Sequence, residues 1–199
     1  GIIVEPGVVN DGVGKFVKDI IDVVPDSDDF EKSLKNSGAE ILINLLPVGS
    51  DEAVKFYAQS AINTKIGFIN CIPVFIARDE IWYNKFKENK VPLIGDDIKS
   101  QVGATIVHRV LAQLFSDRGV KLKNTYQLNV GGNMDFLNML EEDRLETKRT
   151  SKTSSVTSVA NNGKGIDPDN VRIGPSDYVK WLEDRKKAFI RLEGESFGG

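Results

Sequence analysis

Apolar residues in the first half of the chain form short runs that alternate with helical patterns. The run ILINLL, from Ile41 to Leu46, is nearly continuous and is typical of a strand buried on both faces of a parallel sheet. Shorter runs follow at Gly67 to Asn70 and at Val91 to Ile94. A helix is expected after the first strand, from about Asp51 to Ile62, with Ser50 as its N-cap. This alternation predicts an α/β fold built on a parallel sheet.

After Gly95 the pattern changes to one long amphipathic helix followed by strands. Apolar residues at helical spacing predict a helix from Gln101 to Phe115, with Ser100 near its start. Tyr126 to Val130 alternates like a half-buried strand, and Ala188 to Leu192 is expected to form another strand. The second half therefore combines helix and strands in a different order from the first half.

Three further segments carry weaker patterns. Lys15 to Val24 predicts a helix with one apolar face, and Trp181 to Lys187 predicts a helix near the end of the chain. Residues 154 to 169 are rich in Ser, Thr, Asn and Gly and predict a mobile or partly structured loop.

The composition excludes several classes of function. A net charge of −3 and an acidic sequence pI near 5.3 leave no basic excess for nucleic acid or a membrane surface. No apolar run approaches the ~18 residues of a membrane span. The single cysteine, Cys71, cannot form an internal disulfide, and the single histidine, His108, leaves no His/Cys set for a zinc site. We therefore expect a cytoplasmic protein without a zinc site of His and Cys ligands, in which Cys71 is buried or lines a site and His108 is structural.

A basic segment, RLETKRTSKT from Arg144 to Thr153, is the first candidate for chemistry. In a helix the spacing of Lys148 and Lys152 places both ammonium groups on one face, where like charges are unfavourable unless an anion lies between them. Ser151 and Thr153 add hydroxyl donors, so the segment suits a phosphate group. A solvated basic segment is the alternative interpretation.

Other polar candidates cluster at the ends of the expected elements, where α/β proteins place their ligands. They are Asp96, Asp97, Ser100, Asn133 and Asp135. The glycines of GGN, Gly131 and Gly132, allow positive φ and close approach of the backbone to a ligand. The turn PVGS, from Pro47 to Ser50, is followed by a helix N-terminus and can cradle part of a dinucleotide, although a plain structural turn explains it as well. The chain contains no GxGxxG fingerprint.

Six longer motifs appear in a fixed order along the chain. They are INLLPVGSDEAVKFYAQSA, NCIPVFIA, GDDIKSQVGATIVHR, QLNVGGNMDFLNM, RLETKRTSKTSSV and IGPSDYVKWLEDRK. Together they closely resemble the prokaryotic type of myo-inositol-1-phosphate synthase, from about Ile41 to Gly199. The resemblance implies an isomerase that converts D-glucose 6-phosphate to 1D-myo-inositol 3-phosphate in inositol and phospholipid biosynthesis. It also implies bound NAD, with oxidation at C5, enolisation, an intramolecular aldol closure and reduction by the same NADH, in a homotetramer.

The resemblance gives three lysines different roles. Lys148 matches the lysine expected to exchange the proton of the C5 hydroxyl during hydride transfer. Lys152 matches a position that holds the phosphate. Lys186 is our choice for the lysine that protonates the C1 oxygen during ring closure, with Lys180 as its rival. Acid and base chemistry by lysines requires neighbouring groups that lower the pKa of the ammonium group and orient the side chain.

The remaining matches are carried over in the same way. Asp97 and Asp135 are expected to pair with the lysines and orient them in catalysis. The resemblance places the cofactor beside Gly49, Ser50, Tyr57, Ser100, Asp135 and Lys148. It places the substrate beside Asn133, Ser151, Lys152 and Thr153.

Two segments of the family are absent from this sequence. One is the N-terminal glycine-rich dinucleotide fingerprint, and the other is a later segment with a DSPN-like motif and a further catalytic lysine. We therefore expect an excised portion of a longer protein, which by itself binds NAD weakly and has no turnover.

The expected fold class is α/β with two domains. Residues 1 to 94 are predicted to form the C-terminal portion of an NAD-binding Rossmann-like domain with a partial parallel sheet. Residues 95 to 199 are predicted to form an α+β catalytic and tetramerisation domain with an open mixed sheet. Two alternatives remain: another NAD(P)-dependent oxidoreductase with a second domain like that of dihydrodipicolinate reductase, and a non-catalytic oligomerisation module.

Overall fold

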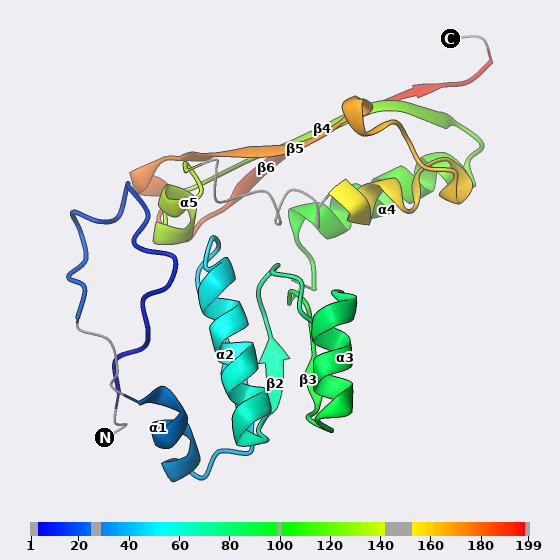
Figure 1. The fold of residues 1–199 in the computed structure, drawn as a ribbon. Coiled ribbons are helices and arrows are strands. Elements are labelled where there is room, and N and C mark those ends of the chain that lie inside the picture. The colour runs from blue at the N-terminus through cyan, green and yellow to red at the C-terminus, as the bar shows by residue number, and fades with distance from the viewer. Residues whose placement is uncertain (1–3, 25–28, 99–100, 142–152, 198–199) are drawn as a thin grey trace. The chain divides into compact units, whose positions relative to one another are not determined.

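The computed structural model in Figure 1 describes residues 4–24, 29–98, 101–141 and 153–197. The chain divides into two compact units, Gly1–Ile98 and Lys99–Gly199, each with a sheet and a core of its own. In the described ranges, no helix is long and apolar enough to cross a membrane.

The first unit is a three-stranded parallel sheet whose strands are joined by helices. Its elements in chain order are α1 (Phe30–Asn36), β1 (Ile41–Asn44), α2 (Asp51–Thr64), β2 (Gly67–Asn70), α3 (Glu80–Glu88) and β3 (Leu93–Ile94). The strand order is β1-β2-β3, and both pairs are parallel. The predicted α/β alternation is therefore confirmed, while α1 and α3 had no counterpart in the sequence patterns.

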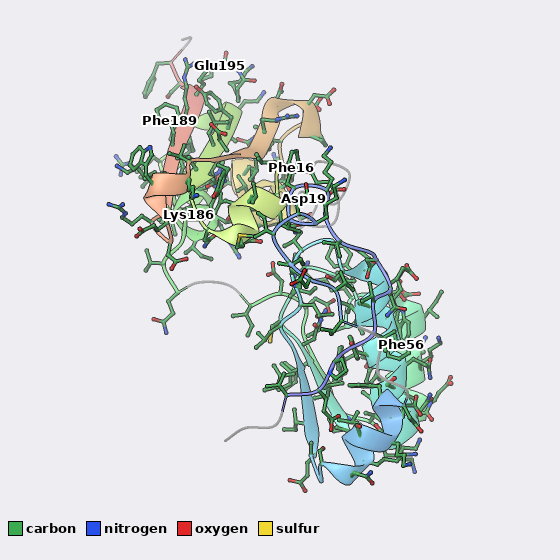
Figure 2. All side chains as sticks on the ribbon, turned by 90° about the vertical axis from the view of Figure 1, so that its left-hand side faces the viewer. Phe16, Asp19, Phe56, Lys186, Phe189 and Glu195 are labelled. Atoms are coloured by element: carbon green, nitrogen blue, oxygen red, sulfur yellow. The ribbon has the colours of Figure 1, made fainter. Side chains whose placement is uncertain are left out.

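The core of the first unit lies on one face of its sheet. Val54 and Ala58 of α2 are fully buried against Phe68 of β2 and Phe86 of α3. The helices lie on the same side of the sheet (Figure 2). Ile41 and the other apolar residues of the opposite face are exposed, with Ile41 at 55%, Ile43 at 54% and Leu45 at 75%. The prediction that this strand is buried on both faces is wrong for the described unit, because its helices cover only one of them.

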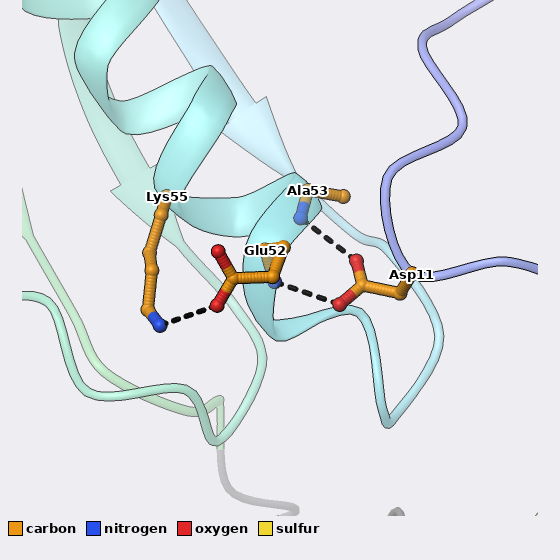
Figure 3. A network of polar contacts seen from close by, with 4 residues as sticks. All are labelled: Asp11, Glu52, Ala53 and Lys55. Atoms are coloured by element: carbon orange, nitrogen blue, oxygen red, sulfur yellow. Dashed lines mark hydrogen bonds and ion pairs between the residues drawn. The ribbon is translucent and has the colours of Figure 1, made fainter.

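The N-terminus of α2 is capped from outside the helix. Asp11 accepts hydrogen bonds from the backbone N–H groups of Glu52 and Ala53, both at 2.8 Å (Figure 3). Ser50 occupies the N-cap position, as predicted, but its side chain makes no capping hydrogen bond. A carboxylate at this end satisfies two helix N–H groups that lack intrahelical partners and complements the helix dipole.

Residues 15–24 form turns rather than the predicted helix. The N–H groups of Val17 and Lys18 bond to the carbonyl of Gly14, and the pattern does not continue as helix. Ile20 and Val24 remain exposed at 60% and 59%, so the apolar face of the expected helix is not covered. Short helices are marginal without such packing, which explains the difference.

The second unit is built on a mixed sheet. Its elements are α4 (Ala104–Asp117), β4 (Lys121–Gly131), α5 (Met134–Asn138), η2 (Ala160–Gly163), η3 (Pro168–Asn170), β5 (Val171–Tyr178), η4 (Lys180–Leu182) and β6 (Lys187–Glu195). The strand order is β5-β4-β6, with β4 parallel to β5 and antiparallel to β6. This arrangement confirms the predicted α+β part with a mixed sheet, and α4 covers one face of it.

Two predictions of helix bounds in this unit are corrected. Helix α4 begins at Ala104 rather than Gln101, because Gly103 has extended backbone angles (φ −135°, ψ 169°). The helix expected at 181–187 is only a short 3₁₀ turn, because Glu183 adopts a positive φ of 51° and β6 begins at Lys187.

The segment expected to be a loop at 154–169 contributes to the core instead. Residues 153–157 are helical, and Val156 and Ala160 are fully buried in a cluster with Leu122. Asn161 adds two hydrogen bonds to the backbone of Leu122, which join this segment to β4. The segment is polar overall, so its composition did not indicate that its few apolar residues pack into the core.

We predict that Asp11→Ala destabilises the first unit by about 0.5–2 kcal/mol, the usual cost of losing a helix cap. The reason is that the N–H groups of Glu52 and Ala53 lose their acceptor. Chemical denaturation measures the change. Asp19→Ala is the matched control, since Asp19 is exposed in the same segment and should be silent (Figure 2). Equal effects of the two substitutions would contradict the capping role.

Candidate active site

Polar side chains meet at the carboxyl edge of the first sheet. Asn44 ends β1, Asn70 ends β2, and Asp96 follows β3. The Asn44 amide donates to Asn70 Oδ1 at 2.8 Å, and Asn70 Nδ2 donates to Asp96 Oδ1 at 2.8 Å. All three side chains are buried. Because the carboxyl ends of parallel strands share one edge, a single polar network joins all three.

Asp96 also fixes the loop after β2. Its carboxylate accepts the N–H groups of Ile76, Ala77 and Arg78 at 3.0, 3.1 and 3.2 Å. Four donors among the described residues, the three amides and Asn70, thereby stabilise the negative charge. Asp97, the predicted catalytic residue, comes next and is half-buried with a positive φ of 69°. The network therefore positions the backbone that carries Asp97.

The predicted nucleotide loop lies at the same edge, between β1 and α2. Gly49 has a positive φ of 88°, which favours glycine at this turn, and Ser50 is buried. The helix N–H groups that a phosphate can use are partly taken by Asp11. Tyr57 accepts the N–H of Val8 at 2.9 Å, so this predicted cofactor residue anchors the N-terminal segment in the structure.

In the second unit, the two glycines of GGN are required by packing. A Cβ on Gly131 would lie 2.4 Å from the Phe136 ring, and one on Gly132 would lie 2.4 Å from the backbone of Glu183 and Val179. Neither glycine has a positive φ. The expectation of positive φ is therefore wrong, and the close approach is to protein atoms of α5 and of the segment before β6.

Several predicted site residues gather around α5. Asn133 caps this helix by accepting the N–H of Phe136 at 3.2 Å, and it donates to Asp184 at 3.2 Å. The Lys186 ammonium lies 5.9 Å from the centre of the Phe136 ring, a cation–π distance. Asp135 is exposed in the first turn of the helix. The end of β4 thus brings predicted substrate-binding and catalytic groups to one place.

Other predicted residues are not placed by the structure. Ser100, Lys148, Ser151 and Lys152 lie outside the described residues. Thr153 is half-buried at the start of the helical residues 153–157. Lys180, the rival of Lys186, is exposed in η4. No group of three or more His, Cys, Asp or Glu residues in the described ranges can hold a metal ion.

Comparison with known proteins gives matches along the chain. The family model described as myo-inositol-1-phosphate synthase matches residues 103–199. A protein named inositol-3-phosphate synthase from Mycolicibacterium smegmatis is 57% identical over 99% of this chain and 55% of the relative. One of the same name from Mycobacterium tuberculosis is 56% identical over 99% of this chain and 53% of that protein. This chain belongs to the myo-inositol-1-phosphate synthase family. It spans about half the length of the relatives it matches.

Solved structures agree with this family and fold. A myo-inositol-1-phosphate synthase-related protein from Thermotoga maritima is 27% identical, with a TM-score of 0.66 over 85% of this chain and 49% of that one. The inositol-3-phosphate synthase of Caenorhabditis elegans is 18% identical, with a TM-score of 0.75 over 98% of this chain and 46% of that one. At that identity the second match supports the fold alone. The resemblance inferred from the six motifs is confirmed.

Sequence reasoning did not predict the polar network of Asn44, Asn70 and Asp96 at the carboxyl edge of the first sheet. The sequence patterns place Asn44 and Asn70 within strands, and they give Asp96 as a polar candidate at a strand end without indicating its partners. A signal was available, because an asparagine stands at the fourth position of both ILIN and GFIN. Asp184, the partner of Asn133, had no signal, since 51 residues separate the two in sequence.

We predict that Asp96→Asn lowers the free energy of unfolding by about 1–3 kcal/mol, the range for leaving a buried donor unpaired. An amide offers one acceptor oxygen in place of two, so the N–H groups of residues 76–78 cannot all be satisfied. Chemical denaturation measures the loss. Asp22→Asn, at an exposed position, is the control. Unchanged stability of the Asp96 variant would show that the network does not hold the edge together.

Proposed function

We propose that the protein carrying this chain is an inositol-3-phosphate synthase that converts D-glucose 6-phosphate to 1D-myo-inositol 3-phosphate. The observation that carries the proposal is the 57% identity to a protein of that name, which runs through both units of the chain. Identity at this level favours the same reaction over a different reaction within the family. The polar edge of the first unit and the α5 cluster of the second supply the kind of groups that this chemistry needs.

The first unit has features that fit a dinucleotide such as NAD. A parallel sheet with polar groups at its carboxyl edge is where α/β proteins bind nucleotides, and Gly49 has a positive φ in the first loop at that edge. A bound NAD would supply the redox chemistry, as acceptor and later donor of the hydride at C5 of the sugar. Gly49, Ser50 and Tyr57 would hold it on the side of α2, and Ser100, Asp135 and Lys148 on the side of the reacting sugar.

The chain's own residues would hold the sugar and move its protons. Lys152, Ser151 and Thr153 bind the phosphate with an ammonium and two hydroxyl groups. Lys148 takes and returns the proton of the C5 hydroxyl, and Lys186 protonates the C1 oxygen when the ring closes. Asn133 contacts the substrate, and the carboxylates of Asp97 and Asp135 orient the lysines. The placement of Lys186 beside Phe136, in the helix that Asn133 caps, supports Lys186 over Lys180.

We also propose a cytoplasmic homotetramer that supplies inositol for phospholipid biosynthesis. The support is the uncovered face of the second sheet, where Leu128 and Phe189 are 42% and 57% exposed. The rings of Tyr126 and Phe189 lie side by side there, with centres 5.8 Å apart and planes tilted by 36°. An apolar sheet face of this kind suits burial against another subunit. Size-exclusion chromatography with light scattering measures the assembly.

We predict that Lys148→Ala abolishes inositol phosphate formation in the full-length protein. The C5 hydroxyl would lose the group that takes its proton, and general acid–base catalysis contributes about 10²–10⁴-fold. The assay supplies glucose 6-phosphate and NAD and measures inositol phosphate together with net NADH, which should not accumulate. Lys164→Ala, at an exposed position, is the control. Retained turnover in a folded Lys148 variant would remove this residue from the mechanism.

We predict that Lys152→Ala chiefly raises KM. A charged hydrogen bond to the phosphate is worth about 1.5–3 kcal/mol, so KM should rise by roughly one to two orders of magnitude while kcat changes less. Lys152→Arg keeps the positive charge and should lose less affinity. Steady-state kinetics with glucose 6-phosphate separates the two parameters. A loss confined to stability would favour a solvated basic segment instead.

A further inference from the structure

A row of buried polar side chains lies between α4 and the sheet of the second unit. His108 of α4 and Gln127 of β4 are fully buried, and Thr125 and Asn129 of β4 are 3% exposed. Residues 125, 127 and 129 alternate along the strand and so share its covered face. A core of this kind requires each polar atom to find a hydrogen-bond partner. Asn129 Nδ2 is the exception in the described part of the chain, because it has no partner there.

The hydrogen bonds of the Thr125 hydroxyl determine that Nε2 of His108 carries a proton. Thr125 donates its single hydrogen to the carbonyl of Arg191 at 2.8 Å. His108 Nε2 lies 2.6 Å from the same oxygen, so Nε2 must be the donor of this second hydrogen bond. The His108 ring therefore carries a proton on Nε2.

The other ring nitrogen determines the orientation of two amides. His108 Nδ1 lies 3.2 Å from Gln127 Oε1, and Gln127 Nε2 lies 3.0 Å from Asn129 Oδ1. These contacts as they stand need a second proton on Nδ1, which makes the ring a cation. With a neutral ring, Nδ1 accepts, and the Gln127 amide must turn over to present its NH₂ group. Gln127 then presents its oxygen to Asn129, and the Asn129 amide must turn over as well.

The environment of His108 favours the neutral ring. Burial lowers the pKa of His108 below its ordinary value of 6.5, and the hydrogen bond with Gln127 acts in the opposite direction. The groups that face the ring are uncharged: Thr125 and Gln127 come from β4, and β6 contributes the backbone carbonyl of Arg191 through Thr125. No charged side chain is among the causes of the shift.

We propose that neutral His108 is a positioning residue that, through Gln127, turns the Asn129 amide so that its oxygen is the atom left without a protein partner. Asn129 stands on β4 two residues before Gly131, and the strand leads directly to α5 and the residues predicted to bind substrate. The chemical class that it would receive is a hydroxyl group, as found on a polyol phosphate. That last step rests on the proposed function, whereas the hydrogen-bond relay does not.

Nitrogen-15 NMR of the imidazole tests the relay directly. His108 is the single histidine of the 199 residues, so its ring signals need no separation from others. We expect one protonated nitrogen, assigned to Nε2, and one unprotonated nitrogen at neutral pH, and the same state as the pH falls through 6.5. A proton on Nδ1 at neutral pH, in either a cation or the other tautomer, would overturn the proposal.

Gln127→Glu tests the coupling between the members of the row. A carboxylate has no hydrogen to donate to Nδ1, so His108 should become doubly protonated at neutral pH. Gln59→Glu makes the same change at a half-buried position of the first unit and should leave the ring neutral. If Gln127→Glu does not fold, Gln127→Met serves instead. It should leave His108 neutral, and the hydrogens of the Asn129 NH₂ group should exchange faster with solvent. The NMR signals of that group are identified by their loss in Asn129→Asp. A neutral ring in folded Gln127→Glu whose introduced carboxyl is ionised, or unchanged exchange in Gln127→Met, contradicts the relay.

Activity of the full-length protein tests the role of the acceptor. Gln127→Met should lower kcat/KM for glucose 6-phosphate by about tenfold, the effect of one neutral hydrogen bond, with the fold retained. Unchanged kcat/KM would show that the Asn129 oxygen does not serve the substrate. The two proposals fail separately. Absence of synthase activity in the wild type overturns the proposed function and leaves the NMR result standing, while a protonated Nδ1 overturns the relay whatever the activity.

Discussion

Both units of this protein depend on the requirement that a buried polar side chain finds hydrogen-bond partners. In the first unit, Asp96 is held by Asn70 and by three backbone amides, and this network joins the ends of all three strands. In the second unit, His108 and Gln127 form a row between α4 and β4. Unpaired, such groups would cost stability, so the networks restrict the backbone to a small set of conformations. The loops that carry the predicted site residues are held in the same way.

The same requirement explains why polar groups in both units gather where strands end. Asn44 and Asn70 close β1 and β2, and Asn129 and Asn133 stand at the end of β4. Side chains at these positions can be held by the sheet while one edge stays available to a ligand. In the first unit the amides of Asn44 and Asn70 are hydrogen-bonded within the protein, whereas Asn129 retains an atom without a partner among the described residues. The buried row of the second unit therefore ends in a polar atom that can take a hydrogen bond from outside the row.

The sequence predicted the elements whose patterns are local and failed where packing decides. The strands at β1 and β2 and the helix α2 follow from apolar runs and helix signals, and the family follows from six motifs in order. The helix expected at 15–24 is absent because its apolar face finds no cover, and the presumed loop at 154–169 contributes Val156 to the core. Of the predicted site, the structure brings Asn133 and Lys186 to α5. Lys148 and Lys152 lie outside the described residues, and their roles stay predictions.

The sequence by itself determined the family, the alternation of strands and helices, and the types of side chain available for phosphate and proton chemistry. These properties depend on residues close together in the chain or on motifs matched one by one. Only the tertiary structure decided that Asp11 caps α2, that Asp184 meets Asn133, and that the glycines of GGN accommodate protein atoms. It also decided that His108, expected to be structural, is linked to Asn129 through Gln127. The physical reason is that hydrogen bonds and close contacts join residues far apart in sequence, whose meeting depends on the whole fold.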